Sequence, residues 1–133
     1  MRTQFLSAGA ALCMLAGCVA TPTSLTIVER GAKPDLDPSL KLVHQHLKRT
    51  LKDYDSIKDF TVKHGEIYPI SATNLGYNFE QAWMLCVEYN AKNSYGAYVG
   101  IQPHGFPLRV DEAGMPFLVS TINWRTHANG SCN

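Results

Sequence analysis

The side chains of this chain best suited to covalent chemistry are its cysteine thiols, which can be acylated, oxidised to a disulfide or used to bind a metal. They are Cys13, Cys18, Cys86 and Cys132. Cys18 directly follows an uncharged run of 13 residues, 5–17, which is preceded by Arg2. A positive start, an apolar stretch of this length and small residues at its end predict a cleavable secretory leader. A transmembrane helix needs roughly 20 apolar residues, so we do not expect a permanent one here.

The end of this run, Leu15-Ala16-Gly17-Cys18, resembles the lipobox of bacterial lipoproteins. The resemblance implies that residues 1–17 are removed, that diacylglycerol is attached to the sulfur of Cys18, and that the new amino terminus is acylated. One acyl chain holds a protein on a bilayer only marginally, whereas two or three make an effectively permanent anchor. The alternative is an ordinary secretory leader in which Cys18 is incidental.

Val19, which follows the cysteine, is not acidic. By resemblance to lipoprotein sorting rules, such a residue favours the outer membrane over the inner one. We therefore expect a protein of the cell envelope that is held to the membrane by lipid on Cys18 and faces the periplasm.

Cys86 and Cys132 remain after processing, in an oxidising compartment where disulfides persist. We expect them to pair and to close a long loop, which contributes on the order of 4 kcal/mol in the chain-entropy model. The alternative is a buried free thiol at Cys86 and a loose one at Cys132. We expect no metal and no cofactor, because the cysteines lack CxxC spacing and the histidines do not converge in sequence.

The charge balance disfavours a nucleic-acid partner. Residues 1–17 contain one charged side chain, Arg2, so the remaining 116 residues carry 11 Lys and Arg against 11 Asp and Glu. A chain without a broad basic field is a poor candidate for nucleic-acid binding. Its length is enough for one small domain and a tether.

Residues 90–100, Asn-Ala-Lys-Asn-Ser-Tyr-Gly-Ala-Tyr-Val-Gly, are the most unusual stretch after the leader. Rigid aromatic side chains beside adaptable polar ones are typical of binding surfaces. The candidate binding residues are Asn90, Lys92, Asn93, Tyr95 and Tyr98. The alternative is structural, because Asn and Gly tolerate left-handed backbone and Gly in a strand lets a neighbour pack closely.

No catalytic residues can be assigned from spacing. His44 and His46 are two apart on an expected helix and point to different sides. Asp111 and Glu112 are adjacent in an expected turn, so their carboxylates point apart. No serine lies in a Gly-x-Ser-x-Gly elbow.

Three segments also resemble a group of small proteobacterial exported proteins and lipoproteins without assigned function. They are Leu51-Lys52-Asp53-Tyr54-Asp55-Ser56, Cys86, and Asn90-Ala91-Lys92-Asn93-Ser94-Tyr95-Gly96. This chain departs from the pattern at Tyr54, where proline is usual, at Tyr89, where valine is usual, and at Ala97, where glycine is usual. The resemblance spans most of residues 40–102 and implies export and a shared fold, without an activity.

The elements that must position these residues begin with a tether. Residues 18–36 are rich in Thr, Pro, Ser and Gly, and we expect a lipidated N-terminus and a flexible tether there. Residues 37–133 are expected to form one α+β domain. Asp37 suits an N-cap and Pro38 the first helical position. A helix from there to residues 52–53 carries an apolar stripe of Leu40, Val43, Leu47, Leu51 and Tyr54.

Alternation of apolar and polar residues predicts strands after the helix. We expect them at 60–68, 80–90, 95–102, 106–110 and 117–122. Pro69 should end the first, residues 71–78 should be a loop, residues 103–105 should interrupt the third, and residues 111–114 should form a turn.

The expected fold is therefore α+β, with one N-terminal helix packed on an antiparallel sheet of about four strands in two layers. The expected core residues are Leu40, Val43, Leu47, Leu51, Trp83, Leu85, Val87 and Val99. Two functions stay open: a non-catalytic, lipid-anchored module that binds an envelope protein, or a small envelope enzyme or saccharide- or peptidoglycan-binding protein.

Overall fold

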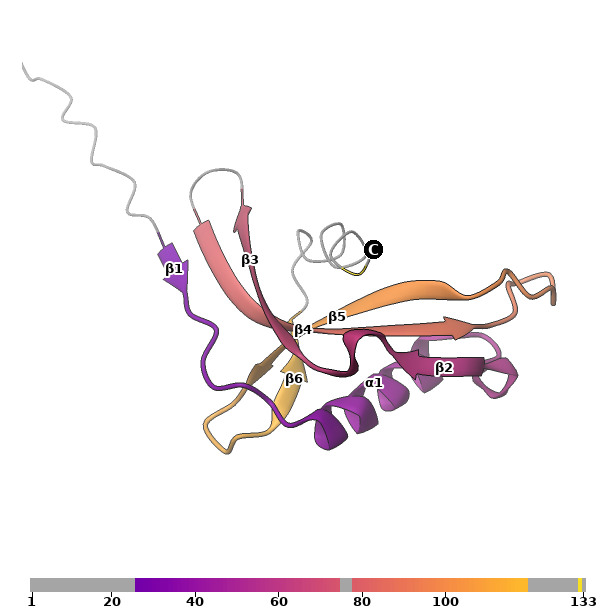
Figure 1. The fold of residues 1–133 in the computed structure, drawn as a ribbon, viewed down its shortest axis with the longest axis horizontal. Coiled ribbons are helices and arrows are strands. Elements are labelled where there is room, and N and C mark those ends of the chain that lie inside the picture. The colour runs from indigo at the N-terminus through magenta and orange to yellow at the C-terminus, as the bar shows by residue number, and fades with distance from the viewer. Residues whose placement is uncertain (1–25, 75–77, 120–131, 133) are drawn as a thin grey trace, which may run out of the picture.

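The computed structural model describes residues 26–74, 78–119 and 132, which form one helix against a curled mixed sheet (Figure 1). In chain order the elements are β1 (Thr26–Val28), α1 (Leu36–Thr50), the 3-10 turn η1 (Tyr54–Ser56), β2 (Lys58–Val62), the 3-10 turn η2 (Lys63–Gly65), β3 (Tyr68–Asn74), β4 (Asn78–Asn90), β5 (Gln102–Val110) and β6 (Pro116–Leu118). The expected α+β class is confirmed. Within the described ranges the sheet has six strands rather than about four, and the parallel β1 makes it mixed.

β4 is the central strand of the sheet. Along one edge, β3 pairs with residues 78–84 and β2 with residues 87–90, both antiparallel. Along the other edge, β5 pairs antiparallel with residues 83–89 and β1 pairs parallel with residues 78–80. β6 pairs with the end of β5. The 13 residues of β4 span about 40 Å, at about 3.3 Å per residue.

The β2–β3 edge differs from the single strand expected at 60–68. His64 (φ 62°) and Gly65 (φ 69°) turn the chain through η2, so one edge of β4 is covered by two successive strands. Pro69 does not end a strand but lies inside β3, opposite Trp83. A proline is tolerated there because β3 is an edge strand, where a missing N–H donor need not break a ladder.

Three other strand expectations were also wrong. Residues 71–78 are not one loop, because β3 continues to residue 74 and β4 begins at residue 78. Residues 95–102 do not form a strand, and β5 starts only at Gln102. Residues 103–105 do not interrupt β5 but pair with residues 86–88 of β4. In the first and third cases the pairing offered by β4 outweighs local propensity, whereas residues 95–101 are not paired with β4, which ends at Asn90.

The expected turn at residues 111–114 is confirmed. The Asp111 side-chain oxygen Oδ1 accepts hydrogen bonds from the backbone N–H groups of Ala113 and Met115, both at 2.9 Å. Gly114 has φ +78°, a value that favours glycine. β6 follows this turn directly, and the part of the expected 117–122 strand beyond residue 119 lies outside the described residues.

α1 begins slightly earlier than expected. Its N-cap is Asp35 rather than Asp37, and Pro38 still lies in the first turn, where its missing N–H costs no helical hydrogen bond. The helix ends at Thr50, just before the expected end at residues 52–53. None of the helical segments in the described ranges has the length and hydropathy that a membrane span requires.

The main core lies between α1 and the sheet. Alternate residues of β4, namely Leu85, Val87 and Tyr89, are buried with Val43 and Leu47 of the helix. The same cluster contains Ile67, Ala91, Phe106 and Leu108. Three expected core residues pack at its margin, partly buried: Leu40, Leu51 and Trp83.

The opposite face of β4 carries the cysteine pair. Cys86 and Cys132 are disulfide-bonded and fully buried, with Cα atoms 5.6 Å apart, which agrees with the expected pairing. Met84 is buried in the same cluster, and the Tyr68 hydroxyl lies 2.9 Å from the Cys86 sulfur. The disulfide therefore attaches residue 132 to the sheet face that the helix does not cover.

Part of the expected tether, residues 18–36, packs on the sheet. β1 pairs with β4, and the Arg30 guanidinium donates hydrogen bonds to the carbonyl oxygens of Ala82 (3.0 Å) and Ile70 (3.4 Å). The same guanidinium lies over the Trp83 ring, 5.2 Å from its centre. The folded unit thus begins by residue 26, ahead of the boundary expected at residue 37.

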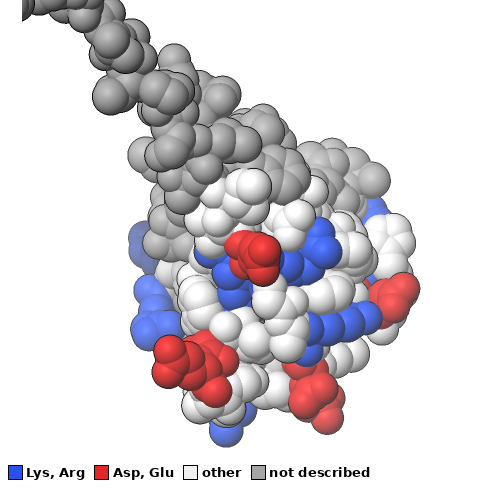
Figure 2. Space-filling model, turned by 90° about the vertical axis from the view of Figure 1, so that its left-hand side faces the viewer, with Lys and Arg blue, Asp and Glu red and all other residues white. Residues whose placement is uncertain are grey.

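The end of the molecule at which β1 lies carries mixed charge. Figure 2 shows basic and acidic side chains interspersed on this face, without a large area of one sign. Two ion pairs link its elements: Arg109 with Glu80 at 3.5 Å, and Lys33 with Glu66 at 3.6 Å. Lys33 and Glu66 are exposed, and exposed pairs contribute little to stability.

Candidate functional site

The candidate site lies at the end of the sheet where α1 and β4 both end (Figure 1). The 15 residues of α1 are about 22 Å long at 1.5 Å per residue, whereas β4 spans about 40 Å. One helix therefore cannot cover the whole strand, and α1 packs on its second half, where Leu85, Val87 and Tyr89 are buried against it. Past the end of α1 the β4–β5 connection, which we call the distal loop (residues 91–101), projects from the sheet (Figure 1).

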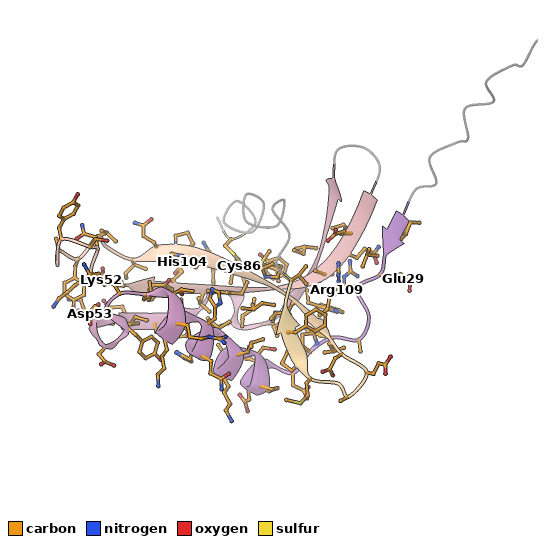
Figure 3. The ribbon with its side chains drawn as sticks, turned by 180° about the vertical axis from the view of Figure 1, so that it is seen from behind. Glu29, Lys52, Asp53, Cys86, His104 and Arg109 are labelled. Atoms are coloured by element: carbon orange, nitrogen blue, oxygen red, sulfur yellow. A yellow bond between two sulfur atoms is a disulfide. The ribbon has the colours of Figure 1, made fainter. Side chains whose placement is uncertain are left out.

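The distal loop and β1 lie at opposite ends of the long axis (Figure 1). The pairing register explains this arrangement, because Thr26 of β1 is opposite Asn78 at the start of β4, and the loop follows the end of β4 at Asn90. Figure 3 places Lys52 and Asp53, which follow the helix, at the loop end, and Glu29 at the other. The surface predicted from residues 90–98 is thus remote from the point where the chain enters the fold.

Two of the candidate binding residues hold the loop backbone. Asn93 Oδ1 accepts hydrogen bonds from the N–H groups of Tyr95 (2.9 Å) and Ala97 (3.1 Å). Asn90 Oδ1 accepts one from Gly100 N–H at 3.0 Å. For Asn90 and Asn93, the structural role expected as the alternative is therefore the observed one. Their side-chain oxygens hold the loop backbone and are not free to bind a ligand.

The apolar side chains of the loop point outward. Tyr95 is 95% exposed, Ile101 54%, Val99 53% and Tyr98 42%. Val99 was expected in the core, but it precedes β5 and lacks a paired strand that would bury it. Sequence reasoning also missed Ile101, because an isolated apolar residue beside a proline-containing strand carries no distinctive signal.

Tyr98 is flanked by two lysines. The ammonium nitrogen of Lys58 lies 3.8 Å from the centre of the Tyr98 ring, and that of Lys92 lies 5.6 Å from it. Lys92 and Tyr98 also form a backbone bridge. Lys58 was not among the candidate residues, and only the pairing of β2 with the end of β4 brings it here.

Beside the loop is a hollow of about 170 Å³, which we call the distal hollow. It is lined by Leu51, Tyr89, Ala91, Lys92, Asn93, Val99, Gln102 and His104. Two candidate residues, Lys92 and Asn93, contribute to this lining, whereas the others were assigned no site role from the sequence. Its position follows from the end of α1 at Thr50 and of β4 at Asn90, because Leu51 and Ala91, the next residue after each, both line it.

An aromatic stack forms one wall of the distal hollow. The rings of Tyr89 and His104 lie 4.2 Å apart and nearly parallel, and Phe60 stacks on Tyr89 at 6.1 Å. Burial lowers the pKa of His104 from its usual 6.5 and raises the pKa of Tyr89 from 10.0. Both side chains are therefore neutral near pH 7.

No protein family, curated protein or solved structure matches this chain significantly. The site must therefore be interpreted from its own geometry.

His44 and His46 both have structural contacts. His44 Nδ1 lies 2.9 Å from the Tyr54 hydroxyl, and its ring packs on Phe60 at 4.5 Å. His46 lies edge-on to Phe106. Within the part of the chain that the structure describes, no three His, Cys, Asp or Glu side chains are grouped so as to hold a metal ion.

The arrangement is suited to binding. It combines an ordered loop, outward apolar side chains, two cations and a small hollow, which are features of recognition surfaces. Cys18 and the other residues of the expected anchor lie outside the described residues.

Proposed function

We propose that this protein is a bacterial envelope lipoprotein, anchored by lipid on Cys18, that acts as a non-catalytic interaction module. The observation that carries the proposal is the exposure of Tyr95, Tyr98, Val99 and Ile101 on a loop whose backbone is held by asparagine side chains. Several exposed apolar side chains within one short segment are typical of sites of contact with a partner. An ordered loop also loses less conformational entropy on binding than a floppy one.

The position of the loop supports a partner away from the anchoring membrane. The lipid on Cys18 would precede β1, and the distal loop lies at the other end of the long axis. Such a module presents the loop to another protein of the envelope, while the lipid restricts it to the membrane surface.

Two experiments test the proposal. Cys18→Ala should release the protein from the membrane fraction, with the unmodified chain as control; unchanged fractionation contradicts the anchor. A photo-crosslinking amino acid at Tyr95 should give a discrete adduct in intact cells, identifiable by mass spectrometry. The matched control is the same amino acid at Met115, which is also exposed but lies in the β5–β6 turn. Equal or absent adducts at both positions would contradict a partner at the distal loop.

A saccharide or peptidoglycan ligand is the second candidate, favoured by one observation. The Tyr95 ring is almost fully exposed and so offers a stacking surface for a sugar ring. Binding to purified peptidoglycan that Tyr95→Ala abolishes, and that Met115→Ala leaves intact, would favour this candidate over a protein partner.

A further inference from the structure

We propose that the distal hollow receives an aliphatic side chain of a partner peptide that carries a carboxylate next to it. This inference rests on the proposed interaction function and specifies the chemistry of the partner. It follows from the size of the hollow, the character of its walls and the charge at its rim.

The size of the hollow fits a single side chain. Its volume of about 170 Å³ is close to that of an apolar cavity of about 150 Å³ that holds one benzene-sized group. Leu51, Ala91 and Val99 supply aliphatic walls from three separate segments. A leucine-sized group would cover these walls and remove them from water.

The aromatic wall is unsuited to stacking on a sugar. β2 and β5 lie on opposite sides of β4, so Phe60 and His104 stack on opposite faces of the Tyr89 ring. Both faces of Tyr89 are therefore occupied within the protein. This observation favours an aliphatic group over a saccharide ring in the hollow.

The charge of the rim favours an anionic neighbour. Lys92 is the one lining residue that carries a full charge at neutral pH, and no acidic side chain lines the hollow. Lys58 approaches the same Tyr98 ring, so the two ammonium groups lie within about 10 Å of each other. Among the described residues, neither lysine forms an ion pair. Lys48 and Arg49 in the last turn of α1 offset the negative end of the helix dipole.

The test is a titration of the ¹⁵N-labelled full-length protein, followed by NMR, with the peptide acetyl-Gly-Glu-Leu-Glu-Gly-amide. We expect saturable shifts at the amides of Ala91, Val99, Gln102 and His104. Replacing the peptide leucine by alanine should weaken binding at least about tenfold, because the group that fills the hollow is lost. Replacing both peptide glutamates by lysines should weaken it further.

Two variants probe the hollow and its rim. Val99→Trp should abolish binding by filling the hollow, and Lys92→Gln should weaken it about threefold. Both residues are exposed, so thermal unfolding should be unchanged. The matched controls, Met115→Trp and Lys41→Gln, alter exposed residues elsewhere and should bind like the parent.

Three results would overturn the inference: equal shifts with all three peptides, full binding by Val99→Trp, or shifts of the same amides by N-acetylglucosamine instead of the leucine peptide. If the peptides do not bind but the Tyr95 adduct persists in cells, the inference about the hollow fails and the interaction function stands. If the photo-crosslinker at Tyr95 gives no adduct in cells, the interaction function itself is contradicted.

Discussion

Loss of the Cys86–Cys132 disulfide should lower the free energy of unfolding by about 4 kcal/mol. The two cysteines are 46 residues apart, and the entropy of closing a loop of that length in the unfolded chain corresponds to about 4 kcal/mol at 25 °C. A domain of about 100 residues has a total stability of about 5–15 kcal/mol. The disulfide would therefore supply a large share of it.

Urea denaturation of the parent with and without reductant isolates the cross-link, because reduction leaves every side-chain atom in place. The double variant Cys86→Ala/Cys132→Ala should lose slightly more, since two fully buried sulfur atoms are also removed from contact with Met84. Reductant should have no effect on the double variant, which makes it the control for reductant effects elsewhere in the chain.

A loss below about 1 kcal/mol on reduction would refute the reasoning. It would mean that residues 86 and 132 stay close in the unfolded ensemble, so that the cross-link restricts little. Alkylation of both thiols in the unreduced protein would refute the pairing itself.

Three further predictions concern the loop, the hollow and β1. Asn93→Ala removes the acceptor of two backbone hydrogen bonds, so the free energy of unfolding should fall by about 1–2 kcal/mol in urea, while Asn93→Asp should retain most of it; equal losses would contradict the acceptor role. Burial lowers the pKa of His104 below its unfolded value of 6.5, so its contribution to stability is complete above that pH and is lost as the pH falls through it. The free energy of unfolding should thus decrease from pH 7 to pH 5, and His104→Gln should flatten this profile; identical profiles would count against it. Arg30→Ala removes two hydrogen bonds to the sheet and should increase hydrogen exchange in β1 but not in β5, and unchanged protection at residues 26–28 would contradict that role.

Local sequence patterns predicted the elements that depend only on residues close together in the chain. The 3- and 4-residue spacing of Leu40, Val43 and Leu47 located α1 to within a few residues. Asp111 with Gly114 located the β5–β6 turn. The expected core residues Leu85 and Val87 are buried under α1, since alternate side chains of a strand point to the same face.

Strand boundaries depended on partners far away in the chain. Residues 103–105 look like an interruption, yet β4 supplies a complete set of partners for them. Residues 26–28 have no distinctive pattern, and they form a strand because the start of β4 has a free edge beside them. A segment becomes a strand when residues of another strand lie opposite it in register. The local sequence pattern does not say which residues those are.

The sequence by itself determined the expectation of a lipid anchor at Cys18, which stays a prediction, and it narrowed the remaining cysteines to one possible pair. It also located the unusual segment at residues 90–100. Only the tertiary structure decided what this segment does: Asn90 and Asn93 hold the backbone, Tyr95 is exposed, and Lys58 lies over Tyr98. The distal hollow forms because α1 ends at Thr50 and β4 ends at Asn90 at the same end of the sheet, so that Leu51 and Ala91 line it together; only the packing of the two elements decides this.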